Sequence, residues 1–102
     1  MQNDEDIARL VQQGNHALFE QLIDRYEQKL LRYARKFLAS TQDGEDIIQE
    51  VFIKAYRNIQ SFDANQKFSP WIYRIAHNEC INFLKKRHLD TVSLSLFELD
   101  TF

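Results

Sequence analysis

One stretch of the sequence carries side chains that suit contact with single-stranded nucleic acid. Aromatic rings can stack on unpaired bases, amides can hydrogen-bond base edges, and cations can contact phosphates. The same mixture is also typical of a half-buried helix with a solvated rim, so residue types alone leave both interpretations open. The side chains at steps of three and four are Trp71, Arg74, Asn78, Asn82 and Lys85, with Tyr73 and His77 beside them.

A second polar group, Asp46, Gln49 and Glu50, shares one face of a predicted helix. A catalytic carboxylate pair and a protein-docking patch would look alike in sequence. Catalysis by paired acids needs a partner base, a metal or a pocket, and this helix lacks Glu-x-x-His and His-Glu-x-x-His ligand spacing. We therefore predict that the chain is not an enzyme.

Metal and cofactor chemistry is weakly represented. His77 and Cys80 could donate two ligands, but no further pair accompanies them. A solvent-edge histidine and a core cysteine explain such spacing more simply. Phosphate-cradling glycine loops and a nucleophile elbow are absent from the sequence. The sequence predicts no cofactor and no metal.

Composition favours one all-α domain. The chain has 102 residues, 44% of them hydrophobic and 27% charged, with two glycines and one proline to supply turns. A single cysteine, no apolar leader and no run of about 20 apolar residues indicate a reduced, cytoplasmic setting. The net charge of −2 opposes nucleic-acid binding, but bases gather between Lys67 and Arg87 while acids gather before Asp24.

Hydrophobic spacing predicts a compact bundle of about four helices with a long second helix. The first spans about 4–13, and Asn15 is expected to cap the second, which keeps its period to Phe37. The pattern breaks at 40–44, and a third helix follows to Ile59. A loop over 60–68 precedes the fourth helix, which Ser69 caps and which ends near Arg87. Residues 90–102 are interpreted as a polar linker outside the core.

The basic face of the second helix is interpreted mainly as a solvated surface, and only secondarily as a nucleic-acid track. Its members are Arg25, Lys29, Arg32, Arg35 and Lys36.

The chain resembles region 2 of the extracytoplasmic-function sigma factors of bacterial RNA polymerase, within the sigma-70 family. The resemblance runs through most of the chain in the order of the family's own segments. It is carried by Ala17-Leu18-Phe19-Glu20 with residues 30–34, by Asp46-Ile47-Ile48-Gln49-Glu50-Val51-Phe52 with residues 53–56, and by Phe68-Ser69-Pro70-Trp71-Ile72-Tyr73-Arg74 with residues 75–78.

This resemblance implies a transcription initiation factor with two binding surfaces. The third helix would dock on the coiled coil of the largest-subunit clamp of RNA polymerase core, through Asp46, Gln49, Glu50 and Phe52. We expect the three polar residues to form an exposed patch, with Phe52 partly exposed. An anti-sigma factor is a further expected partner.

The loop and the fourth helix would recognise and melt the minus-ten promoter element by capturing unstacked bases of the non-template strand. We expect a pocket with an aromatic floor and a wall of amides, beneath the end of the loop. The matching positions are Phe62, Lys67, Phe68, Trp71, Tyr73, Arg74, His77, Asn78, Asn82, Lys85 and Lys86. His77 stands where Arg is frequent and Asn82 where Asp is frequent, which bears on the promoter sequence preferred.

The resemblance also sets the expected domain organisation: region 2 over 1–89, and the start of an interdomain linker over 90–102. The helix-turn-helix domain of region 4 is expected to be absent, as in a single domain or a truncated product. The alternative is a helical protein-interaction module without DNA binding, in which Trp71 and Tyr73 contact another protein. Its binding would be indifferent to salt and to base identity.

Overall fold

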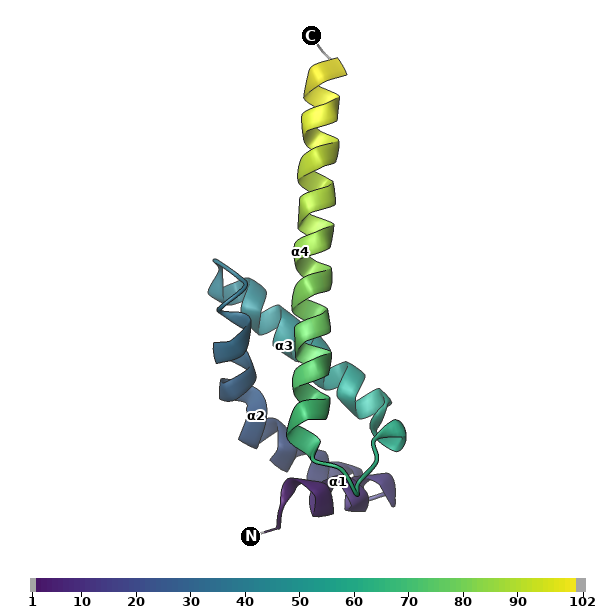
Figure 1. Ribbon diagram of the computed structural model, residues 1–102. Helices are drawn as coiled ribbons and strands as arrows, with labels where there is room; N and C mark the ends of the chain where they lie inside the picture. The colour runs from purple at the N-terminus through teal and green to yellow at the C-terminus, as the bar shows by residue number, and fades with distance from the viewer. Residues whose placement is uncertain (1, 101–102) are drawn as a thin grey trace.

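The computed structural model describes residues 2–100, with side chains described over 2–89. The elements in this part of the chain are helical, and none is a strand, so the all-α prediction is confirmed. Figure 1 shows α1 across one end of the bundle and α4 running lengthwise past α2 and α3. The elements are α1 (Asp4–Gln12), η1 (His16–Leu18), α2 (Phe19–Ala34), α3 (Thr41–Arg57), η2 (Ile59–Ser61) and α4 (Phe68–Asp100).

Helix α1 begins and ends where its residue types predict. The Asn3 side chain accepts a hydrogen bond from the Asp6 backbone N–H at 2.7 Å, and Gly14 turns the chain with a φ of 112°. Asn15 makes no side-chain cap bond, contrary to our prediction. The 3-10 turn η1 stands between it and α2, so the second helix starts later than expected.

Helix α2 ends at Ala34, before the predicted end at Phe37. The backbone N–H groups of Lys36 and Phe37 bond three residues back, to Tyr33 and Ala34. This tighter turn leaves the Phe37 ring 5.3 Å from that of Tyr33. The apolar period therefore continues through a segment that is no longer α-helical.

Helix α3 begins at Thr41 and includes Gly44, which the sequence pattern had assigned to a break. Ser40 caps the helix by accepting from the Asp43 N–H at 3.3 Å. Gly44 is buried, and a Cβ there would lie 3.3 Å from Leu31 Cδ1. The glycine lets α3 approach α2 closely, which local sequence does not reveal.

Helix α4 begins at Phe68, so Ser69 lies within its first turn and is not the cap residue. The helix also continues past the predicted end at Arg87 as far as Asp100, because no glycine or proline follows to stop it. The predicted linker is thus helical in backbone over 90–100, and 101–102 lie outside the described residues. Its role between domains stays a prediction.

The core draws apolar side chains from each of the four α-helices. Helix α4 contributes Ile72, Ala76 and Cys80, all fully buried, and burial raises the pKa of the Cys80 thiol. Among the described helices, none has the length and hydropathy needed to cross a membrane. Over the same residues, no group of three or more His, Cys, Asp or Glu side chains is placed to hold a metal ion.

Candidate functional site

A groove of about 350 Å³ brings part of the predicted reading face together. Trp71, Asn78 and Asn82 line it from α4, where both asparagines are exposed and Trp71 is half-buried. Asn58 and Ser61 close the other side. A ring and two amides one turn apart can together contact the face and the edge of an unstacked base.

Trp71 is supported from behind by two phenylalanines. Its ring centroid lies 5.1 Å from that of Phe62 and 5.6 Å from that of Phe68. Phe62 is 5% exposed and Phe68 is 0% exposed, so the loop residues expected to form an open aromatic floor belong to the core. They hold the indole in place, and direct base contact by either ring would require the loop to move.

Tyr73 and His77 lie on another face of α4, toward α2. The Tyr73 ring is 5.4 Å from that of Tyr33, and the Tyr33 hydroxyl lies 2.8 Å from His77 Nδ1. Neither residue lines the groove of Trp71. The structure therefore divides the predicted reading face into two surfaces.

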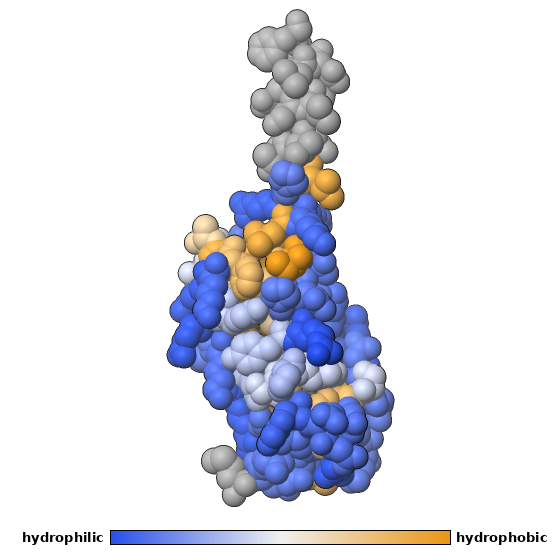
Figure 2. All heavy atoms as spheres, viewed as in Figure 1, coloured by the Kyte–Doolittle hydropathy of each residue, from blue (hydrophilic) through white to orange (hydrophobic). Residues whose placement is uncertain are grey.

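The predicted phosphate-contacting residues are spread along the molecule. Arg74, Lys85 and Lys86 are exposed on α4, and Lys67 is exposed at the end of the loop, where it lines a pocket shared with α1. Figure 2 shows a largely hydrophilic surface, with hydrophobic residues gathered where α4 leaves the other helices.

Several cations of the basic α2 face are engaged within the domain. Arg25 pairs with Asp4 at 2.9 Å, and the Lys29 ammonium lies 5.3 Å from the Tyr26 ring centroid. These contacts within the domain favour the interpretation of that face as a solvated surface over that of a nucleic-acid track.

An ion pair between Lys54 of α3 and Glu79 of α4 crosses the groove of Trp71. The hydrogen bond to Glu79 raises the pKa of the Lys54 ammonium. The pair neutralises a carboxylate that would otherwise repel a phosphate backbone. It also joins the two helices that form the groove.

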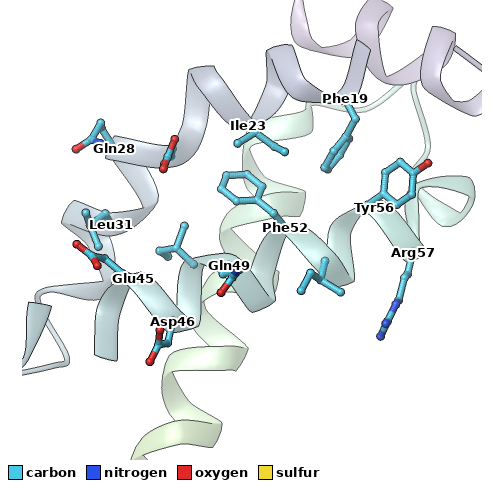
Figure 3. A pocket seen from close by; sticks show the side chains of 13 residues that line it. Phe19, Ile23, Gln28, Leu31, Glu45, Asp46, Gln49, Phe52, Tyr56 and Arg57 are labelled. Atoms are coloured by element: carbon cyan, nitrogen blue, oxygen red, sulfur yellow. The ribbon is translucent and has the colours of Figure 1, made fainter. Parts of the chain in front are cut away.

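A larger groove of about 740 Å³ runs between α2 and α3, and Asp46, Gln49 and Phe52 line it (Figure 3). Figure 3 shows Phe19 and Tyr56 toward one end and Asp46 toward the other, with Phe52 between the helices. Asp46 and Gln49 are exposed, as predicted. Phe52 is buried, with only 7% of its surface exposed, whereas we expected it to be partly exposed.

Glu50 is half-buried and so less exposed than predicted. It lines a second groove, between α3 and α4, which it shares with Asp46, Glu79 and Lys86. Two further residues line the larger groove and were not predicted from the sequence as docking residues: Ile53 and Tyr56, both exposed. Their spacing of four from Gln49 and Phe52 was the available signal.

Residues 22–89 match the family model described as Sigma-70 region 2. The chain therefore belongs to the sigma-70 region 2 family, and the resemblance inferred from its motifs is confirmed.

Among its relatives is the ECF RNA polymerase sigma factor SigW of Bacillus subtilis (strain 168), 42% identical over 80 residues. That match covers 78% of this chain and 43% of SigW, so the chain spans less than half the length of this relative.

Two solved structures share the fold. An engineered region 2 of sigmaE in complex with GTAAAA, studied by NMR, superposes with a TM-score of 0.80 at 40% identity, covering 85% of this chain and 90% of that one. CnrH in complex with the cytosolic domain of CnrY gives a TM-score of 0.73 at 30% identity, covering 78% and 51%.

Proposed function

We propose that this domain is part of a transcription initiation factor that recognises and melts the minus-ten promoter element by capturing unstacked non-template bases. It acts by binding and not as an enzyme, in the cytoplasm with RNA polymerase. The observation that carries the proposal is the groove in which Trp71, Asn78 and Asn82 meet. Its support is the 40% identical region 2 of sigmaE, which was solved with GTAAAA.

The geometry of the groove suits stacking and hydrogen bonding. Phe62 and Phe68 hold the Trp71 ring, so little side-chain freedom is lost when a base stacks on it. Stacking of about 1–3 kcal/mol per base offsets the few kcal/mol that extruding a base costs. The exposed Asn78 amide can then read a base edge, and Arg74 can contact a phosphate outside the groove.

The polymerase-binding role belongs to the α2–α3 groove. We propose that a helix of the polymerase clamp coiled coil lies in it, with its apolar side chains against Phe52, Ile53 and Tyr56. Asp46 and Gln49 would then make polar contacts at the rim. Glu50, which faces α4, is the least well placed of the predicted docking residues.

An inhibitory protein partner, an anti-sigma factor, is also proposed. Its support is the solved complex of CnrH, a relative in structure, with the cytosolic domain of CnrY.

The test of base reading is a titration of labelled single strands with the domain bound to bacterial RNA polymerase core. The strands carry GTAAAA and variants in which each base is changed in turn, so that the preference of this chain is measured. Asn78→Ala should weaken the preferred strand by about 1–3 kcal/mol and relax the preference at one position.

Asn15→Ala is the matched control, because Asn15 is exposed and makes no side-chain cap bond. If the wild type binds every strand with equal affinity, and salt does not change that affinity, this proposal is wrong and the domain is a protein-interaction module.

A further inference from the structure

Three polar side chains of α1 form a stripe that faces the connection between α3 and α4. Glu5, Arg9 and Gln12 are spaced at i, i+4 and i+7, so they project from one side of the helix. Gln12 Nε2 donates to the backbone carbonyl of Ile59 at 2.8 Å and to that of Phe62 at 2.7 Å. One amide group thereby holds both ends of the turn η2.

The rest of the stripe holds the loop that follows. Arg9 donates to the Ala64 carbonyl at 3.3 Å, and Glu5 Oε2 accepts from the Phe68 N–H at 2.9 Å. Phe68 is the first residue of α4, so the Glu5 carboxylate also complements the positive end of that helix. The connection is thus bonded to α1 at its start, its middle and its end.

Helix α1 is itself fixed against the bundle. Ile7, Ala8 and Val11 are fully buried, and Asp4 accepts hydrogen bonds from Arg25 and Tyr26 of α2. A loop bonded to α1 therefore takes its position from the core of the domain. The stripe precedes the residues 22–89 that match the family model.

The position of the connection determines the shape of the groove. Phe62 and Phe68 flank the loop and contact Trp71, and Ser61 of η2 lines the groove opposite Asn78. We propose that the stripe of Glu5, Arg9 and Gln12 positions the base-reading groove, with Gln12 as its principal positioning residue. This inference rests on the function proposed for that groove.

Gln12→Glu is the most informative variant. It replaces the amide that donates to two carbonyls with a carboxylate that cannot donate to them and repels their oxygens. Gln13→Glu is the matched control, because the neighbouring Gln13 is exposed and the change in composition and charge is identical. Gln12→Met removes the donors without adding charge, and it carries the test should the carboxylate unfold the domain.

The assay uses the domain bound to bacterial RNA polymerase core. It measures affinity for the best-bound strand of the GTAAAA set and for its single-base variants. The emission of Trp71, the one tryptophan in the chain, is recorded on the free domain, so that no tryptophan of the core contributes. Gln12→Glu should lower affinity for the preferred strand by about fivefold or more, equivalent to one lost hydrogen bond, and should reduce the preference over the variants. It should also shift the Trp71 emission while leaving affinity for core unchanged.

Gln13→Glu should change none of these quantities. An unaltered strand preference in Gln12→Glu and Gln12→Met, or an equal loss of core affinity, would overturn the positioning role. Asn78→Ala is measured in parallel to separate the two proposals. If Asn78→Ala weakens the preferred strand and the Gln12 variants do not, the positioning role fails while the proposed function stands. If none of them has an effect, the proposed function fails.

Discussion

Replacing Tyr26 by Phe removes one oxygen atom from the interface between α1 and α2. The Tyr26 ring is 4% exposed and packs edge-on against Phe68 with 5.4 Å between centroids, a contact that Phe retains. The hydroxyl donates to Asp4 Oδ2, and Asp4 also accepts from Arg25 at 2.9 Å. The substitution therefore removes the hydrogen bond to the charged Asp4, together with a contact to the Ser69 side chain.

The expected loss lies at the lower end of the range for such bonds. A hydrogen bond to a charged group contributes about 1.5–3 kcal/mol. The Asp4 side chain is 23% exposed and keeps Arg25, so water can replace part of what is lost. We expect the free energy of unfolding to fall by about 1.5 kcal/mol, equivalent to roughly 6–12 °C in Tm for a chain of this size.

The buried Tyr26 hydroxyl also makes stability depend on pH. Burial, and then the hydrogen bond to Asp4, raises the pKa of Tyr26 well above its ordinary value of about 10. Above about pH 10 the unfolded chain releases the Tyr26 proton, while the folded chain keeps it. The free energy of unfolding therefore falls as the pH rises, by at most about 1.4 kcal/mol per pH unit. Phe lacks this proton, so the gap between wild type and variant should narrow.

Urea denaturation followed by circular dichroism, near pH 7, 9 and 10.5, measures both effects. The remaining tyrosines are present in both proteins and cancel in the comparison. Tyr56→Phe is the matched control, because Tyr56 is exposed and the loss of its hydroxyl group should leave stability nearly unchanged. A loss below about 0.5 kcal/mol near pH 7, or a gap that is constant across this range, would refute the reasoning.

Lys85→Ala should weaken binding to all strands alike, because an exposed phosphate contact carries no sequence information. It should also reduce the slope of log affinity against log salt concentration by about 0.7. A change in strand preference in this titration would contradict that role. Gln49→Lys should weaken binding to polymerase core about tenfold or more, as measured by fluorescence anisotropy, because it places a charge in the α2–α3 groove. Gln42→Lys, exposed on the same helix and outside that groove, is its control, and equal losses in the two variants would argue against docking there. Gly44→Ala should raise the free energy of unfolding in urea by about 0.5–1 kcal/mol through helix propensity, provided that Leu31 Cδ1, 3.3 Å from the new Cβ, moves toward the groove that it borders. A loss of stability instead would show that Leu31 is held in place.

Much of the fold could be predicted because helical periodicity is a local property. Ile72, Ala76 and Cys80 recur every four residues, an apolar stripe typical of an amphipathic helix, and all three are buried in the core. The motif around Asp46 and the one around Trp71 identified the family, which the comparisons confirm. These signals depend only on residues that are close in sequence, so they can be recognised in a single sequence without a structure.

Helix ends were harder to predict, because each depends on contacts made elsewhere. Gly44 looks like a break until α2 is packed against it, and Glu5 bonds the first N–H of α4 across 63 positions in sequence. The cap at Ser69 was therefore predicted two residues too late, since α4 begins at Phe68. Beyond Arg87, no stop signal ended the helix where the family's linker was expected.

The sequence alone determined the helices, the apolar stripe of α4 and the residue types of the candidate site. Only the tertiary structure decided which of those residues share a surface. Trp71 and Tyr73 lie two positions apart on one helix, yet α3 and η2 border the first while Tyr33 of α2 packs against the second. Phe62 is buried in the core for the same reason. The hydrogen bond from Gln12 to the Ile59 carbonyl of η2 could not be predicted, because it produces no periodic pattern in the sequence. Burial and long-range hydrogen bonds are set by what the fold brings alongside a residue, and its own residue type does not record that.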